Sequence, residues 1–262
     1  MTIDTSRSRP GIDTSGRRPG IDTSGRRPGI DTSGRRPGID VVIAARNEAT
    51  TVADVVSAAR ACRFTREVIV VDDGSTDGTA EIASAAGAKV LRRESGSGSK
   101  ANAMELGVAA SDADAILFCD ADLVGLLPSH LDGICVPYLE GRAAMSVGWF
   151  DYGMLNPLVR RLPPTSGERL VPRWVWDSVH PLKRSGYSIE IMINEVIAEG
   201  RLPTTVRIMP GVYHRTKRHK LGRRRGYRET WRMFWHLIGL PATGVVRWRT
   251  QWFYLRGLSV DD

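Results

Sequence analysis

Short apolar runs alternate with longer amphipathic stretches along the first half of the chain. Apolar runs of about four to eight residues are typical of buried strands, and the stretches between them are long enough for helices. This alternation predicts strands at 39–44, 68–71, 89–92 and 115–119, separated by helices at 48–61, 78–86, 100–109 and 128–139. Strands and helices that recur in this way form βα units, so we expect a mostly parallel sheet with helices on both faces.

The second half of the chain has a less regular pattern. It predicts strands at 143–150 and 204–209, and helices at 166–179 and 187–199. After Gly211 the chain becomes basic and aromatic, and we expect it to be helical to its end.

A nine-residue unit repeats near the start of the chain, beginning at Arg9, Arg18, Arg27 and, incompletely, Arg36. A repeat this polar and this rich in Gly and Pro cannot bury a core, so we expect a disordered tail; a metal-binding or docking tail is the alternative. The sequence therefore predicts three parts: a repeat tail at 1–37, a single α/β domain at 38–221, and a basic aromatic helical extension at 222–262.

Charge is distributed unevenly along the chain, whose formal net charge is +8. Basic side chains gather at both ends, whereas residues 37–214 hold 17 basic and 22 acidic groups. An acidic central part argues against a nucleic-acid-binding core and suits a metal site. The three cysteines lack metal-ligand spacing and are typical of reduced thiols. No secretory signal is visible and no apolar run reaches the ~18 residues that span a bilayer, so we expect a cytoplasmic protein.

Acidic side chains follow two of the predicted strands. Asp73 comes after the second strand, and Asp120, Ala121 and Asp122 come after the fourth. Carboxylates at the carboxyl ends of strands lie where open α/β sheets bind ligands. Two carboxylates with one residue between them can hold a divalent cation and, through it, a diphosphate. Asp73 can accept hydrogen bonds from a base or a ribose, although a capped turn would also explain it.

Two further motifs are candidates for nucleotide contact. A nucleoside could lie against the small backbone at Ala45, with Glu48 near its ribose or base; Glu48 could instead only complement the helix dipole. Lys100 follows a Gly/Ser loop and begins a predicted helix, where backbone amides and an ammonium group can hold phosphate. The alternative for this loop is a mobile linker.

Two residues of the second half could complete a site. Glu190 begins an apolar helix and could point toward the ligand, or it could be a surface acid. His214 follows a strand and could be a third metal ligand beside Asp120 and Asp122, or a structural histidine.

The C-terminal stretch combines Lys and Arg at 217–225 with seven aromatic residues at 231–254. Such a segment suits the headgroup boundary of an anionic membrane or a polyprenyl phosphate. A packed oligomer interface, as in a homodimer, and nucleic acid are the alternatives.

Four motifs taken together resemble the family 2-type glycosyltransferases with the GT-A fold. They are Val41–Glu48, Val70–Thr79, Gly98–Ala103 and Asp120–Leu123. The resemblance implies a nucleotide-sugar donor, with Glu48 and Asp73 at the nucleoside and Lys100 at the diphosphate or sugar. It also implies Mg²⁺ or Mn²⁺ at Asp120 and Asp122, and adds Ala45 and Ala121 to the residues that line the donor.

The second half is also similar to glucosyl-3-phosphoglycerate synthases. Ser166–Glu168 matches their acceptor loop, Gly186–Glu190 their sugar-binding glutamate, and Gly211–His214 their metal-binding histidine. This chain is shorter between Phe150 and Ser166, and the same motifs occur in polyprenyl-phosphate glycosyltransferases of the dolichyl-phosphate-mannose type.

The resemblance therefore implies a metal-dependent transfer of a hexose from a UDP-sugar such as UDP-glucose, with Asp122, Glu190 and Lys100 as catalytic candidates. The acceptor could be phosphoglycerate-like, a polyprenyl phosphate or a sugar. A GDP-mannose enzyme at the inner face of the membrane is the alternative within this class, and a catalytically inactive scaffold is the alternative outside it.

Overall fold

A computed structural model describes residues 38–93, 99–151, 166–179, 189–215 and 256–261 of this chain. The N-terminal repeat, most of the Gly/Ser loop before Lys100 and the basic aromatic stretch at 217–254 lie outside these ranges. The expected tail, membrane contact and dimer interface therefore stay predictions.

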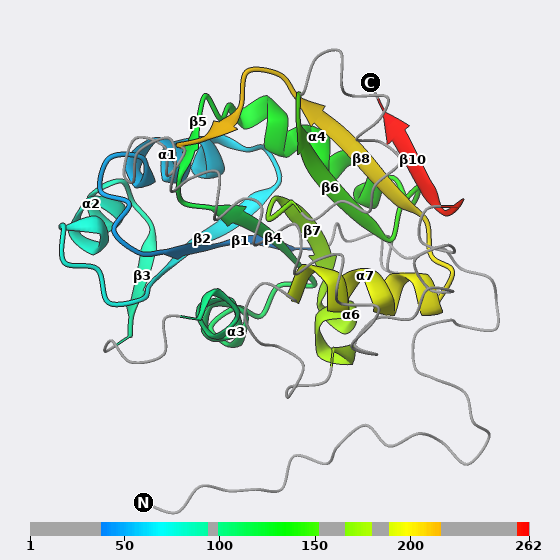
Figure 1. Ribbon diagram of the computed structural model, residues 1–262, viewed down its shortest axis with the longest axis horizontal. Helices are drawn as coiled ribbons and strands as arrows, with labels where there is room; N and C mark the ends of the chain where they lie inside the picture. Colours follow the sequence, from blue (N-terminus) through cyan, green and yellow to red (C-terminus); the bar gives the residue numbers. More distant parts are fainter. Residues whose placement is uncertain (1–37, 94–98, 152–165, 180–188, 216–255, 262) are drawn as a thin grey trace, which may run out of the picture.

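An eight-stranded sheet forms the centre of the described part, in the order β10-β8-β6-β7-β4-β1-β2-β3 (Figure 1). Its strands are β1 (Ile39–Ala45), β2 (Thr65–Asp72), β3 (Lys89–Arg92), β4 (Ala115–Asp120), β6 (Met145–Phe150), β7 (Arg169–Pro172), β8 (Thr204–Met209) and β10 (Leu258–Asp261). Neighbouring strands are parallel except where β7 pairs with β4 and β6. The predicted mostly parallel sheet is confirmed.

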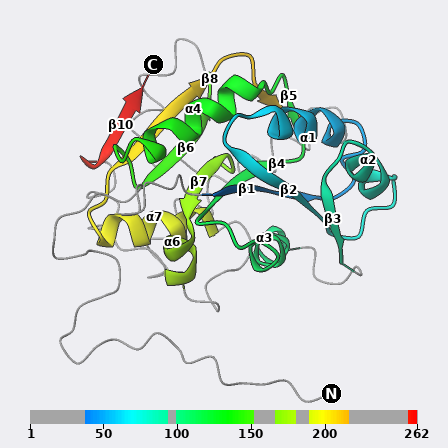
Figure 2. The same cartoon turned by 180° about the vertical axis from the view of Figure 1, so that it is seen from behind.

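Helices cover both faces of the sheet (Figures 1 and 2). One face carries α1 (Val52–Ala61), α2 (Thr79–Ala85) and α4 (Pro128–Leu139), and the other carries α3 (Lys100–Ala109), α6 (Arg173–Ser178) and α7 (Ile189–Glu199). Successive strand residues alternate between two hydrophobic cores: Val41 and Ile43 belong to one, and Val42 to the other. Because both faces are covered, the strands read as nearly continuous apolar runs in the sequence.

The predicted helix at 166–179 is wrong in its first half. Residues 166–168 form a loop, Arg169–Pro172 forms β7, and α6 begins only at Arg173. β7 is four residues long and lies between two longer strands, with Arg169 opposite Phe118 and Val147. Its extended shape depends on these distant partners, which a local sequence pattern does not contain.

The predicted helical extension is also wrong at its described end. Residues 258–261 form β10, which pairs in parallel with β8 at one edge of the sheet. Leu258 and Val260 pack against one of the two cores. The sheet therefore includes a strand from beyond position 221, where the sequence placed the end of the domain.

The parallel strands bring the sequence-predicted motifs to one edge. Ala44 at the end of β1 pairs with Asp120 of β4, and Ala45 pairs with Asp72 of β2. A two-stranded sheet of β5 (Leu123–Val124) and β9 (Tyr213–His214) lies beside them, with Leu123 opposite His214. Within the described ranges, no helix combines the length and the apolar character needed to cross a membrane.

Candidate functional site

The centre of the site is the carboxylate of Asp120, at the carboxyl end of β4. The loop at 166–168 runs directly across it, because residue 167 is a glycine: a Cβ atom there would lie 2.6 Å from both carboxylate oxygens of Asp120. Real Cβ atoms essentially never come this close to another atom. Gly167 therefore lets the loop carry Glu168 to the side of Asp120.

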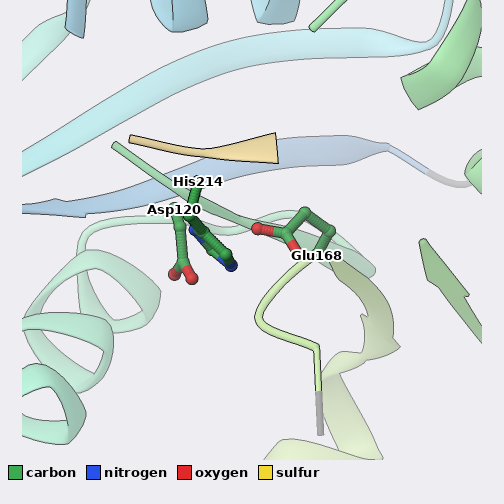
Figure 3. A group of neighbouring side chains, drawn as sticks. All are labelled: Asp120, Glu168 and His214. Carbon is green, nitrogen blue, oxygen red and sulfur yellow. The ribbon is translucent and has the colours of Figure 1, made fainter. Parts of the chain in front are cut away.

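Three side chains from different elements converge at this point (Figure 3). Asp120, Glu168 and His214 each offer one ligand atom, and these atoms lie within 4.8 Å of one another. Glu168 is fully buried, and its Oε1 atom has no hydrogen-bond partner among the described residues. A buried acceptor left without a donor is costly, so this oxygen fits a bound cation. The donor set of carboxylate oxygens and one imidazole nitrogen is one that Mg²⁺ or Mn²⁺ can use.

Asp122 lies beside this group and contacts His214 directly. Its Oδ1 is 2.9 Å from Nδ1 of His214, and its carbonyl oxygen accepts a bond of 2.8 Å from the Arg215 amide. The ring of Phe150 meets the His214 ring edge-on, with the centroids 4.6 Å apart. Asp122 thus orients the imidazole in the described structure, and its role as a metal ligand stays a prediction.

Electrostatics couple the acids and the histidine. Burial lowers the pKa of His214, but the bond to Asp122 and the charges of Glu168 and Asp120 outweigh it and raise the pKa to about 9. Burial, together with the neighbouring Asp120 carboxylate, raises the pKa of Glu168 to about 6. The cluster therefore favours a positive charge at its centre, which a proton on His214 or a metal cation can supply.

Lys100 connects Asp120 to the second predicted acid, Glu190. Its Nζ atom is 2.6 Å from Oδ1 of Asp120 and 3.2 Å from Oε1 of Glu190. Burial lowers the pKa of Lys100, but these two carboxylates outweigh it and raise the pKa. Lys100 is the first residue of α3, so its charge lies at the helix N-terminus that the sequence predicted. It keeps that charge at neutral pH, in reach of the acidic cluster.

The predicted nucleoside residues lie at the ends of β1 and β2: Ala45 is the last residue of β1, and Glu48 and Asp73 lie in the loops that follow the two strands. The Asp73 amide donates to the Ala45 carbonyl at 2.9 Å, and the Glu48 amide donates to Oγ1 of Thr79 at 2.9 Å. The carboxylate of Asp73 accepts a bond of 2.7 Å from Arg93. These bonds tie Asp73 to the end of β1 and Glu48 to the first residue of α2.

Ala121 lies between the two aspartates and is buried. Its carbonyl oxygen accepts a bond of 2.8 Å from Oγ1 of Thr51, just before α1. This bond fixes the backbone between Asp120 and Asp122 against the helix layer.

The structure brings Asp120, Asp122, His214, Lys100 and Glu190 into one chain of contacts. Joined to it are Glu168 and its neighbour Arg169, which were not among the site residues chosen from the sequence. Glu168 was visible only within a motif matched to an acceptor loop, since nothing local indicates that it meets Asp120. Arg169 and Arg93 gave no signal in the sequence, because an arginine that supports a site cannot be distinguished there from one on the surface.

The comparisons with known proteins define the class. The family model described as glycosyl transferase family 2 matches residues 40–230. The chain belongs to this family, which confirms the resemblance seen in its motifs.

Particular relatives are the glucosyl-3-phosphoglycerate synthases. The one from Mycobacterium tuberculosis strain H37Rv is 29% identical over 184 residues, which cover 65% of this chain and 56% of the relative. The chain thus spans little more than half the length of that protein. The succinoglycan biosynthesis protein ExoU of Rhizobium meliloti is 34% identical over 113 residues, covering 42% of this chain and 30% of that protein.

Solved structures give the same relationship. The crystal structure of the Mycobacterium tuberculosis glucosyl-3-phosphoglycerate synthase with Mg²⁺ and UDP has a TM-score of 0.58 and 27% identity, covering 68% of this chain and 72% of that one. The structure of the same enzyme with Mn²⁺, UDP-glucose and phosphoglyceric acid has a TM-score of 0.56 and 28% identity, with the same coverage. The GT-A prediction for the fold is confirmed.

Proposed function

We propose that this chain is a metal-dependent glycosyltransferase, which transfers a hexose from a nucleotide-sugar, UDP-glucose or a similar donor, to a phosphate-bearing or hydroxyl acceptor. The observation that carries the proposal is the convergence of Asp120, Glu168 and His214 at the strand ends, where Oε1 of the buried Glu168 has no donor in the part of the chain that the structure describes. The family and the UDP-glucose complex of the related synthase support the choice of donor.

A divalent cation, Mg²⁺ or Mn²⁺, is proposed at this cluster. Asp120, Asp122 and His214 are the ligands expected from the sequence, and Glu168 joins them on the geometry. When bound, the cation neutralises the charge that develops on the departing nucleoside diphosphate.

The surrounding residues have separate roles in this proposal. Lys100 adds a positive charge beside the diphosphate. Its ammonium group is held in place by the carboxylates of Asp120 and Glu190. Ala45, Glu48 and Asp73 hold the nucleoside at the ends of β1 and β2. Glu190 is the candidate base for a hydroxyl acceptor, whereas a phosphate acceptor is already an anion and needs none.

The acceptor stays open among three classes: a phosphoglycerate-like compound, a polyprenyl phosphate and a sugar. Phosphoglycerate is the acceptor bound by the related synthase, so it is the first to test. A polyprenyl phosphate with GDP-mannose as donor, and contact of the C-terminal segment with a membrane, form the second possibility. An inactive nucleotide-sugar-binding scaffold is the alternative to an enzyme. Assembly into a homodimer is a separate proposal.

The first experiment is a thermal shift screen of the full chain with UDP-glucose and GDP-mannose, each with Mn²⁺ and with EDTA. The proposal expects one donor to raise the melting temperature only with the metal. It also expects transfer to an acceptor and release of the nucleoside diphosphate. Glu168→Gln should weaken the metal-dependent shift. The matched control is Asp132→Ala, which removes an aspartate of α4 that pairs with Arg63. This variant should leave the metal-dependent shift unchanged.

Two results would count against the proposal. If neither donor stabilises the protein with metal, the nucleotide-sugar site is refuted. If UDP-glucose binds with metal but no acceptor class is glycosylated, the scaffold alternative is favoured instead.

A further inference from the structure

Arg169 is a buried arginine that connects two segments of the site. Its Nε and Nη2 atoms donate to the carbonyl oxygen of Ser166 at 2.9 and 2.5 Å. Its Nη1 atom donates to the carbonyl oxygen of Glu190 at 3.1 Å and to Oδ1 of Asn194 at 3.0 Å. One guanidinium group therefore bonds both to the loop that carries Glu168 and to the first turns of α7, which carry Glu190.

The backbone of Arg169 is a rigid starting point for these bonds. It lies in β7 between two strands, opposite Phe118 of β4 and Val147 of β6. The amide of Gly148 also donates to the carbonyl oxygen of Glu168 at 2.7 Å. Because the strand is paired on both sides, the guanidinium can hold the loop and the helix against the sheet.

The direction of the side chain follows from the alternation of the strand. Leu170 packs in the core on the α1 face, and Val171 packs in the core on the α6 and α7 face. Arg169 shares the face of Val171 and so points toward α7. A position that faces this core is normally hydrophobic. The chain instead has Arg169 here, and its side chain is 0% exposed.

Burying an arginine is costly, since its guanidinium stays charged at every accessible pH. The cost is offset here by the four hydrogen bonds to Ser166, Glu190 and Asn194 and by the acids nearby. Burial raises the pKa of Asp120, but Lys100, His214 and Arg169 outweigh it and lower the pKa. The charge of Arg169 therefore acts on the same cluster that its hydrogen bonds hold in place.

We propose that Arg169 is a positioning residue, which sets Glu168 and Glu190 beside Asp120 by bonding to Ser166 and to α7. The inference deepens the proposed function and rests on it for the roles of the two glutamates. A lysine cannot replace the arginine, because a single ammonium does not offer the planar fork that serves the loop and the helix at once.

The test begins with hydrogen–deuterium exchange of the full chain, which needs no activity. Arg169→Lys keeps the charge and removes the fork, so exchange should become faster at 166–168 and at 189–194 while β1 and β2 stay as in the parent. Arg173→Lys is the matched control: both terminal nitrogens of Arg173 donate to the Val108 carbonyl at 3.1 Å, at the far end of α3 from Lys100. This control should leave both segments unchanged. Unchanged exchange at either segment in Arg169→Lys would overturn the inference.

The second readout separates positioning from a structural role alone. The affinity for Mn²⁺ in the presence of UDP, measured by calorimetry, should fall about tenfold in Arg169→Lys, as is usual when the support of a metal ligand is lost. Arg173→Lys should bind as the parent does. Faster exchange with unaltered Mn²⁺ affinity would make Arg169 merely structural and would refute the proposal.

A milder variant covers the case in which Arg169→Lys does not fold. Asn194→Ala removes one acceptor of the guanidinium, so exchange at 189–194 should rise and the Mn²⁺ affinity should fall by a smaller factor. No change in either would overturn the inference. If the parent itself fails to bind UDP with Mn²⁺, the proposed function is lost, while the exchange data still decide whether Arg169 joins the two segments.

Discussion

Without a divalent cation, the stability of this protein should fall as the pH rises from about 6.5 to about 9. The cause is His214, whose pKa rises from 6.5 to about 9: burial lowers it, but Asp122, Glu168 and Asp120 outweigh the burial. A group whose pKa is raised by folding stabilises the protein fully below the unfolded pKa. That contribution is lost as the pH passes through the folded pKa, because the folded state then releases its extra proton.

The size of the effect follows from the geometry. A rise of the pKa from 6.5 to about 9 corresponds to roughly 3 kcal/mol, since each pKa unit is worth about 1.4 kcal/mol. The side chains of His214 and Asp122 are 37% and 33% exposed, so solvent screens their interaction. We therefore expect a loss of only about 1–2 kcal/mol. Burial raises the pKa of Glu168 from 4.5 to about 6. Ionisation of this acid therefore destabilises the protein between these two pH values, below the range in which His214 loses its proton.

The assay is denaturant unfolding in EDTA and in Mg²⁺ at several pH values between 6.5 and 9. In EDTA the free energy of unfolding should decrease over this range, and His214→Gln should flatten the decrease. In Mg²⁺ the stabilisation should grow with pH, because the cation binds the imidazole only after its proton leaves. No decrease for the parent in EDTA, or the same decrease for His214→Gln as for the parent, would show that the proton of His214 does not stabilise the fold.

Three other substitutions test the remaining parts of the structure. Asp122→Ala should lower transfer by at least about a hundredfold while leaving the fold intact, because it removes a predicted cation ligand; normal turnover would disprove that role. Gly167→Ala should cost about 1–3 kcal/mol in denaturant unfolding and weaken Mn²⁺ binding, since its Cβ would lie 2.6 Å from the Asp120 oxygens; parent-like values in calorimetry would contradict the close approach. Asp40→Asn should destabilise by about 1–3 kcal/mol without changing metal affinity, because it removes the bidentate partner of Arg66 at 2.7 and 2.9 Å, away from the site; altered metal binding would show that the two regions are coupled.

Much of the first half could be predicted from local pattern. The elements β3, α3 and α4 have the bounds that the sequence predicted, and the carboxylates of Asp73 and Asp120 lie at the expected strand ends. These features depend on apolar runs and on the rule that parallel strands meet their ligands at their carboxyl ends. The apolar runs and the acids that follow them can both be recognised from residues that are contiguous in the chain.

The second half depended more on distant contacts. The strand β7 was predicted as a helix, because four residues that begin with an arginine carry no period-two signal, and only pairing with β4 and β6 makes them extended. The strand β10 was predicted as part of a helix for a similar reason, since its apolar residues find their place only beside β8.

Residues that are neighbours in the sequence were enough to predict the family, the mostly parallel sheet, and the acids and lysine that follow its strands. Which of these side chains meet depends on how the chain folds. Glu168 reaches Asp120 because a glycine lets the loop pass across it, and Arg169 meets α7 because an antiparallel strand points its side chain there. Both contacts join residues far apart in the chain, and such contacts form when burial and pairing bring the segments together, which no local pattern records.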